Sequence, residues 1–155
     1  MPKLLIFVPC ERVIVSGSEG GDNTASLIAI LEGVEVLKKV PLDAAVPKPW
    51  VIFSLWTRSN GDEDKNYEQI CDMVAPSGKV AITSTLQFRF ALRNHRINVH
   101  VNGLPIGEDG TYLLILYLQE VGKPETKTEY ATFPISVSHE LKAEEPEEPE
   151  IEVEV

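Results

Sequence analysis

The stretch of residues 108–118 constrains the fold of this chain more than any other part of the sequence. It begins with an acidic turn that contains Gly110, places Tyr112 two residues later, and continues directly into an apolar segment, residues 113–118. In many β-sandwich domains such a stretch forms a corner, where the tyrosine ring joins the core and its hydroxyl group binds backbone near the turn. We therefore predict structural roles for Gly110 and Tyr112 in a β-sandwich.

Short apolar segments separated by turn residues occupy most of the remaining chain, which is typical of an all-β domain. Strands are predicted from Lys3 to about Val15 and at residues 27–31, 50–56, 67–74, 79–92, 97–101, 110–118 and 128–138. We expect a single antiparallel β-sandwich with seven or eight strands, of the immunoglobulin-like type or a similar Greek key.

Several of these segments carry more detailed expectations. The run at residues 27–31 suits a strand that is buried on both faces or that bends at Gly33. A break is expected near Ser84, and the prolines in residues 40–49 predict an irregular connection. Pro134 predicts an edge position or a bulge in the last strand. Trp50 and Trp56 lie six residues apart on one strand face, where we expect them to fill the core.

The negative charge of the chain is concentrated at its C-terminal end. The formal net charge is −10, and eight of the 24 acidic residues lie in the last sixteen positions beside one basic residue, Lys142. A segment of this composition cannot bury a core, so we predict a folded domain at residues 1–141 and a disordered acidic tail at residues 142–155. The nearly balanced charge of the body does not favour nucleic-acid binding.

Two features of the sequence bear on the cellular compartment. No segment approaches the roughly 20 apolar residues of a membrane span, and residues 3–8 are too short for a secretory signal. The two cysteines form neither a disulfide framework nor a metal-binding pattern. We therefore expect a cytoplasmic protein.

Residues 2–139 resemble an uncharacterised bacterial family of small β-sandwich proteins of unknown function. The resemblance rests on the order of short features along the chain: a first strand with a glycine-bearing turn, residues 27–31 with Gly33, the strand at 51–53, the turn at 76–78, and residues 104–106 leading to Tyr112. It implies a sandwich fold, and it implies neither an activity nor binding residues.

The sequence offers little support for catalysis. Cysteine and histidine are present, but no local motif sets them in order with an acid. Cys71 is expected in the core, whereas Cys10 is the more reactive candidate because Arg12 lies close enough to stabilise a thiolate. We assign no catalytic residue and expect no cofactor, and we favour a non-enzymatic protein.

Acidic loops provide the alternative function. Asp22, residues 62–64 and the pair Glu108 and Asp109 supply the hard oxygen ligands that calcium prefers. Loops of a sandwich gather at its two ends, so these acids are candidates for a shared site, with Asp62, Asp64 and Asp109 as the metal ligands. The alternative prediction is therefore a calcium-dependent binding domain or a small enzyme.

Two segments are candidates for binding a protein partner. Arg93 and Arg96 belong to the basic part of the chain and suit an anionic group, including the tail of the chain itself. At the C-terminal end, Ile151, Val153 and Val155 alternate with glutamates, a pattern that suits addition as a strand to a sheet edge. Our leading interpretation is an interaction or scaffold module that binds a protein partner, or a second copy of itself, through a sheet edge, loops or its acidic tail.

Overall fold

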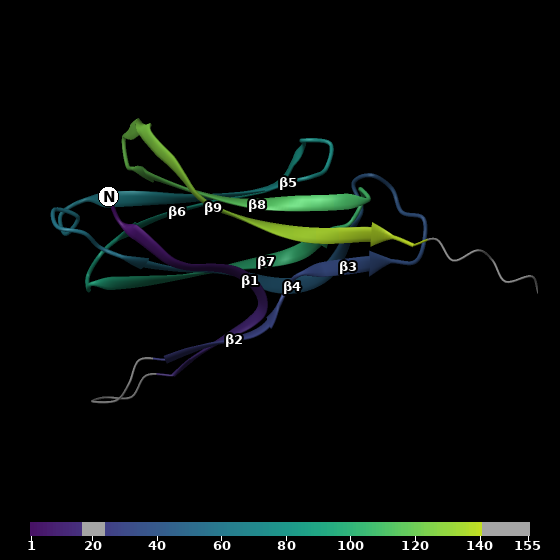
Figure 1. The fold of residues 1–155 in the computed structure, drawn as a ribbon, viewed down its shortest axis with the longest axis horizontal. Helices are drawn as coiled ribbons and strands as arrows, with labels where there is room; N and C mark the ends of the chain where they lie inside the picture. Colours follow the sequence, from purple (N-terminus) through teal and green to yellow (C-terminus); the bar gives the residue numbers. More distant parts are fainter. Residues whose placement is uncertain (17–23, 141–155) are drawn as a thin grey trace, which may run out of the picture.

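The protein forms two packed β-sheets in the computed structural model, which describes residues 1–16 and 24–140 (Figure 1). The described residues contain nine strands and no helix. In chain order these are β1 (Lys3–Ser16), β2 (Thr24–Ile30), β3 (Gly33–Val36), β4 (Ala45–Thr57), β5 (Asn66–Val74), β6 (Val80–Arg89), β7 (Asn94–Pro105), β8 (Gly110–Glu120) and β9 (Lys123–His139). The predicted all-β sandwich architecture is confirmed, but the expected number of seven or eight strands is too low, because β3 forms a separate short strand after β2.

The two sheets have four and five strands. The first sheet has the strand order β2-β1-β4-β7, and the second has the order β3-β9-β8-β5-β6. Every pair of neighbouring strands is antiparallel except β3 and β9, which run parallel from the pair Gly33 and Ser136 to the pair Val36 and His139. The expectation of a purely antiparallel sandwich is therefore wrong at this one pair. Within the described residues, no helix is long and apolar enough to cross a membrane.

The first strand belongs to the sandwich in its first half and to a projecting arm in its second half. Residues 3–10 of β1 pair with β4, whereas residues from Cys10 to Ser16 pair with β2 (Figure 1). The side chains of β2 are half-buried or exposed, so of the two alternatives predicted for residues 27–31, burial on both faces is wrong. The chain then crosses to the other sheet, where Gly33 begins β3 and β3 pairs with β9. A Cβ atom on Gly33 would lie 2.8 Å from the Ser136 carbonyl oxygen, so this approach requires glycine.

The prolines occupy positions where a strand has only one neighbour. The predicted irregular connection at residues 40–49 is wrong at its end, because β4 already begins at Ala45 and contains Pro47 and Pro49. This part of β4 pairs only with β7, and the register shifts between Val46 and Pro49. Pro134 pairs with Leu113 of β8, and β3 meets β9 only from Ser136 onward. A missing backbone N–H is therefore tolerated at these prolines.

Strand β6 runs without interruption from Val80 to Arg89, so the predicted break near Ser84 is wrong. Ser84 pairs with Cys71 in a regular register, because a small β-compatible side chain does not by itself end a strand. The turn predicted at residues 75–78 is present, with a hydrogen bond of 2.8 Å from Gly78 N to Ala75 O. Gly78 has a φ of 91°, a conformation that favours glycine.

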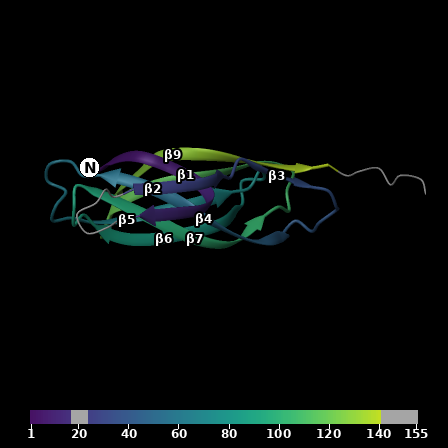
Figure 2. The ribbon, with the colours of Figure 1, turned by 90° about the horizontal axis from the view of Figure 1, so that it is seen from below.

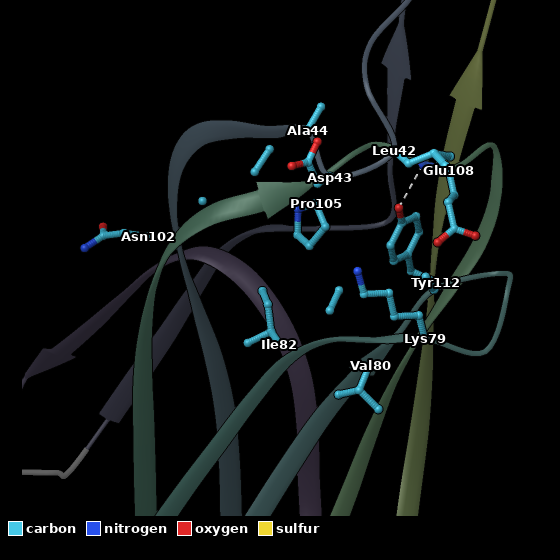
Figure 3. Close-up of a pocket in the computed structure, with 14 residues that line it drawn as sticks. Leu42, Asp43, Ala44, Lys79, Val80, Ile82, Asn102, Pro105, Glu108 and Tyr112 are labelled. Atoms are coloured by element: carbon cyan, nitrogen blue, oxygen red, sulfur yellow. Dashed lines mark hydrogen bonds between the residues drawn. The ribbon is translucent and has the colours of Figure 1, made fainter.

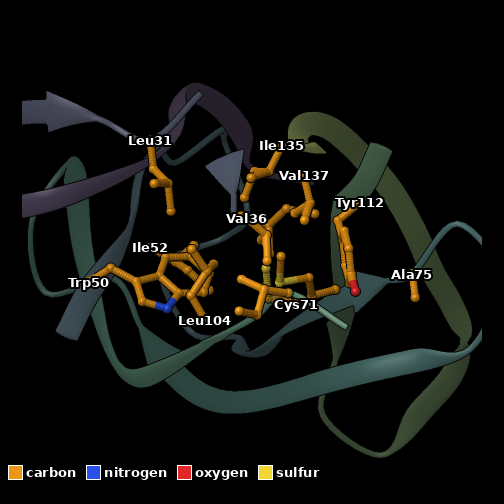
Figure 4. Close-up of a cluster of buried hydrophobic side chains, with 13 residues drawn as sticks. Leu31, Val36, Trp50, Ile52, Cys71, Ala75, Leu104, Tyr112, Ile135 and Val137 are labelled. Atoms are coloured by element: carbon orange, nitrogen blue, oxygen red, sulfur yellow. The ribbon is translucent and has the colours of Figure 1, made fainter. Parts of the chain in front are cut away.

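Buried side chains from both sheets form the core (Figure 4). Trp50 and Trp56 are 1% and 0% exposed, which confirms that they fill the core. Their indole N–H groups are also satisfied: Trp50 donates to the Gly103 carbonyl oxygen at 3.0 Å, and Trp56 donates to Gln69 Oε1 at 2.8 Å. The Trp56 contact and a bond of 2.7 Å from Ser54 Oγ to the same oxygen join β4 of one sheet to β5 of the other.

Candidate functional site

Tyr112 forms the predicted corner at the beginning of β8. Its ring is 1% exposed, and its hydroxyl oxygen accepts a hydrogen bond of 3.0 Å from the backbone N–H of Glu108. Gly110 has a φ of 130°, and a Cβ atom there would lie 3.0 Å from a Pro76 side-chain carbon. Both observations support the structural roles that the sequence predicts for Gly110 and Tyr112.

A second buried tyrosine, Tyr67, organises the loop between β4 and β5. Its hydroxyl group donates to Asp62 Oδ1 at 2.5 Å, and the other carboxylate oxygen accepts the Ser59 backbone N–H at 2.7 Å. Asp62 is only 1% exposed, and the amino group of Met1 lies 3.5 Å from Oδ1. The carboxylate therefore serves as the internal acceptor that holds this loop together.

Tyr67 and Asp62 shift each other's pKa. Burial opposes ionisation of Asp62, but hydrogen bonds from Tyr67 and Ser59, together with the amino group of Met1, outweigh it and hold the pKa of Asp62 below its usual range. Burial and the adjacent carboxylate both raise the pKa of Tyr67. The pair is thus held as an ionised carboxylate and a neutral phenol across the neutral pH range.

The structure does not bring the predicted metal ligands together. Asp62 and Asp64 lie in the loop after β4, whereas Asp109 precedes β8 at the opposite end of the sandwich. Asp64 pairs with Arg89 at 3.2 Å, and Asp109 accepts the backbone N–H of His139 at 2.8 Å. Asp22 falls outside the described residues, and the described part of the chain contains no cluster of three or more metal-ligating side chains.

The cysteines are both in the core. Cys10 is 0% exposed, and burial raises the pKa of its thiol although a backbone hydrogen bond at Arg12 opposes the shift. Arg12 therefore does not activate the thiol of Cys10 in the way that the sequence suggested, because desolvation outweighs the effect of the neighbouring residue. Cys71 lies in the core as predicted, where burial raises its pKa to about 12.

Strands β6 and β7 are the free edges of the two sheets on the same side of the sandwich (Figure 2). Among the described residues, β6 has β5 as its single neighbour and β7 has β4. Side chains that point between the sheets are incompletely covered here: Leu86 is 42% exposed, whereas Phe88, two residues later on the same face, is buried. Val99 and Val101 of β7 are half-buried and pack against the core. We call these two strands and their inward apolar side chains the β6–β7 edge.

A pocket of about 250 Å³ lies at one end of the β6–β7 edge (Figure 3). Val80 and Ile82 of β6, Pro105 of β7 and the segment around Ala44 supply its apolar lining. Lys79, Asp43 and Glu108 supply charged groups, and Tyr112 also lines it. Glu108 is held in place by bonds of 2.9 Å from both the backbone N–H and the hydroxyl group of Ser77. We refer to this cavity as the corner pocket.

The opposite end of the β6–β7 edge is closed by aromatic packing. Phe88 of β6 and His95 of β7 stack with ring centroids 4.7 Å apart and an interplanar angle of 8°. Phe90 contacts both rings edge-on, and burial lowers the pKa of His95. The edge is therefore open at the corner pocket and sealed at the other end.

The charged side chains of β6, of β7 and of the turns that precede them are all cations, whereas the corner pocket also holds Asp43 and Glu108. Residues 73–107 contain no Asp or Glu, and they contain the cations Lys79, Arg89, Arg93 and Arg96. Of these four, only Arg89 forms an ion pair with a described residue. Arg93 lies in the connection between β6 and β7, and Arg96 is half-buried on β7 opposite Leu55. Of the two predicted binding residues, Arg96 thus lies on this edge and Arg93 lies next to it.

Sequence reasoning identified the basic residues but missed the edge itself. The signal that would have revealed it is the absence of acids over residues 73–107 in a chain with a net charge of −10. The hydrogen-bonded pair of Tyr67 and Asp62 was also missed, although the sequence shows a tyrosine five residues after a loop aspartate. The other predicted binding residues, Ile151, Val153 and Val155, lie outside the described residues.

Comparison of the chain with family models, with curated proteins and with solved structures gave no match.

Proposed function

We propose that this protein is a non-enzymatic interaction module that binds an extended segment of a protein partner along the β6–β7 edge. The observation that carries the proposal is the position of two free strands, with half-exposed inward apolar side chains between them, on one side of the sandwich. A free strand offers unpaired backbone donors and acceptors to an incoming strand. The half-exposed apolar positions of this edge offer contacts for alternate side chains of that strand.

The other free edges suit this role less well. β3 has only four residues, and β2 belongs to the arm formed with β1. The β6–β7 edge is longer, with ten residues in β6 and twelve in β7, and it ends in the corner pocket. Its cations would favour a partner segment that carries acidic residues.

The finer features of the fold belong to the same proposal. The order β1-β4-β7 beside β6-β5-β8-β9 matches the A-B-E and C′-C-F-G arrangement of immunoglobulin-like sandwiches, and Tyr112 stands where such domains place their corner tyrosine. This supports an immunoglobulin-like Greek key.

We also propose that the protein works in the cytoplasm and that it belongs to the bacterial family it resembles. Residues 142–155 form a disordered tail in this proposal, as their composition favours.

Selection of random peptides displayed on phage against the full-length protein tests the proposed function. We expect enriched peptides to alternate apolar residues with polar or acidic ones, because only every second side chain of an added strand faces the sheet interior. Leu86→Lys places a charge on the inward face at a position that is already 42% exposed, so the fold should tolerate it. This variant should lose the selected peptides.

Gln87→Lys is the matched control, because it adds the same charge on the outward face of the same strand. It should retain the peptides. Enriched peptides without an alternating pattern, or equal binding by both variants, would show that the β6–β7 edge is not the binding surface.

A further inference from the structure

We infer that the C-terminal segment of the chain itself, residues 150–155, occupies the β6–β7 edge as an added strand in the same molecule. The inference rests on the proposed function, since it names an occupant and a means of regulation for the same surface. Three independent observations support it: complementary charge, the place where the described part of the chain ends, and the residue pattern of the segment.

The charges of the two regions are opposite. Residues 140–155 contain eight acids and one base, whereas residues 73–107 contain four cations and no acid. Lys79, Arg93 and Arg96 make no ion pair with any residue that the structure describes, and they lie at both ends of the edge and between them. Beyond the corner pocket, which also holds Asp43 and Glu108, the glutamates that alternate with the apolar residues of the segment thus meet cations that are unpaired among the described residues.

The described part of the chain ends beside the corner pocket. The backbone N–H of His139 binds Asp109, and a ring nitrogen of His139 lies 2.6 Å from the Ile106 carbonyl oxygen, so the end of β9 is fixed at the β7–β8 corner. From β9 to β6 there are three strand spacings, a distance of about 15 Å. Ten residues, 140–149, precede the segment and span up to about 35 Å when extended, so the linker reaches the pocket end of the edge.

The direction of the chain also fits. A segment that enters at the corner pocket runs from Pro105 toward Asn94, which is antiparallel to β7. β7 is itself antiparallel to β4, so the segment continues the existing hydrogen-bonding pattern of that sheet. Ile151, Val153 and Val155 then point to one face, where Val99, Val101 and Leu86 are incompletely covered.

Attachment in the same molecule gives the segment an advantage over a free partner. A short flexible linker produces an effective concentration on the order of millimolar, which favours the intramolecular complex at ordinary protein concentrations. A partner segment must therefore displace the tail before it binds. The acidic segment acts as a tethered competitor that sets the affinity threshold for the partner.

Paramagnetic NMR on the full chain tests this arrangement. A nitroxide attached at Glu154→Cys reacts selectively, because Cys10 and Cys71 are buried. We expect broadening of amide signals confined to β6, β7 and the corner pocket. In a mixture of isotope-labelled chain without nitroxide and nitroxide-labelled chain without isotope, broadening should be absent, because the contact is made within one molecule.

The combined variant Ile151→Ser, Val153→Ser and Val155→Ser keeps every charge and should abolish the broadening. It should also tighten the apparent Kd of a phage-selected peptide about tenfold, because the competitor is removed. The matched control, Glu152→Asp, should leave both readouts unchanged.

The failures of this inference and of the proposed function are distinguishable. Broadening that is absent, spread evenly over both sheets, or present in the mixed sample would overturn docking in the same molecule, while selected peptides that still require Leu86 would leave the proposed function intact. If broadening is absent and no selected peptide depends on Leu86, both the inference and the proposed function are wrong.

Discussion

Two buried tyrosines secure the two ends of the sandwich, and they do so with opposite hydrogen-bonding roles. At the corner end, the hydroxyl oxygen of Tyr112 accepts a backbone N–H, a neutral contact of 3.0 Å. At the other end, the hydroxyl group of Tyr67 donates to the ionised carboxylate of Asp62 at 2.5 Å. Both rings are essentially unexposed, at 1% and 0%. The apolar contribution is therefore similar at the two ends, and the hydroxyl contribution is not.

The difference shows how the same residue type can stabilise a loop through backbone or through charge. The Tyr112 contact depends on the path of the chain and is insensitive to pH near neutrality. The Tyr67 contact depends on a carboxylate that must remain ionised while it is buried, so it couples the stability of one end of the molecule to pH. Four predictions test this comparison, beginning with the largest expected effect.

Removal of either ring should be the most damaging change. Tyr112→Ala and Tyr67→Ala each delete a buried aromatic side chain, with an expected loss of about 3–5 kcal/mol in the free energy of unfolding. Urea titrations followed by tryptophan fluorescence would measure both losses. A loss below about 1 kcal/mol at either site would show that its ring does not carry core packing at that end.

Removal of the hydroxyl groups alone should separate the two ends. Tyr112→Phe loses one neutral hydrogen bond and should cost about 1 kcal/mol, whereas Tyr67→Phe removes a charge-assisted hydrogen bond from Oδ1 of a buried carboxylate, which keeps the Ser59 N–H on its other oxygen, and should cost about 2–3 kcal/mol. The same urea titrations at pH 7 provide the measurement. Equal costs for the two substitutions would contradict the distinction between a neutral and a charge-assisted contact.

Acid should weaken only the Asp62 end. The pKa of Asp62 in the folded state lies below its usual value near 4, so its ionised form stabilises the fold above that pH. This contribution is lost as the pH falls through the lower, folded-state pKa. The stability difference between the parent protein and Asp62→Asn should therefore shrink on acidification. The difference for Tyr112→Phe should stay constant, and a parallel decrease at both sites would indicate a global acid effect.

The sequence predicted the fold and the corner but not the loop at the other end. Tyr112 was predictable because a corner tyrosine, its glycine and the following strand are adjacent in sequence, so a local pattern determines the contact. Asp62 was interpreted as a metal ligand because its neighbours Glu63 and Asp64 are acidic, and charge alone does not reveal which of three acids is buried. Leu86 and Val101 were assigned to strands, but their incomplete coverage depends on which strands form the edges. Edge position follows from the sheet order, which is a property of long-range pairing.

The smallest effect is expected from calcium, and it tests whether either acidic end is a metal site. At one end Asp62 is buried with Tyr67 and Ser59 as donors, and at the other end Asp109 binds the backbone of His139. A calcium ion would have to displace these donors, and the two ends lie too far apart to share one ion.

Addition of millimolar calcium should therefore change the Tm by less than about 1 °C, since a ligand raises the Tm only when it binds the native state. Magnesium at the same ionic strength is the control for screening. A calcium-specific rise of several degrees that disappears in Asp109→Asn, but not in Asp64→Asn, would establish a metal site at the corner end and favour the calcium-dependent function over the interaction module.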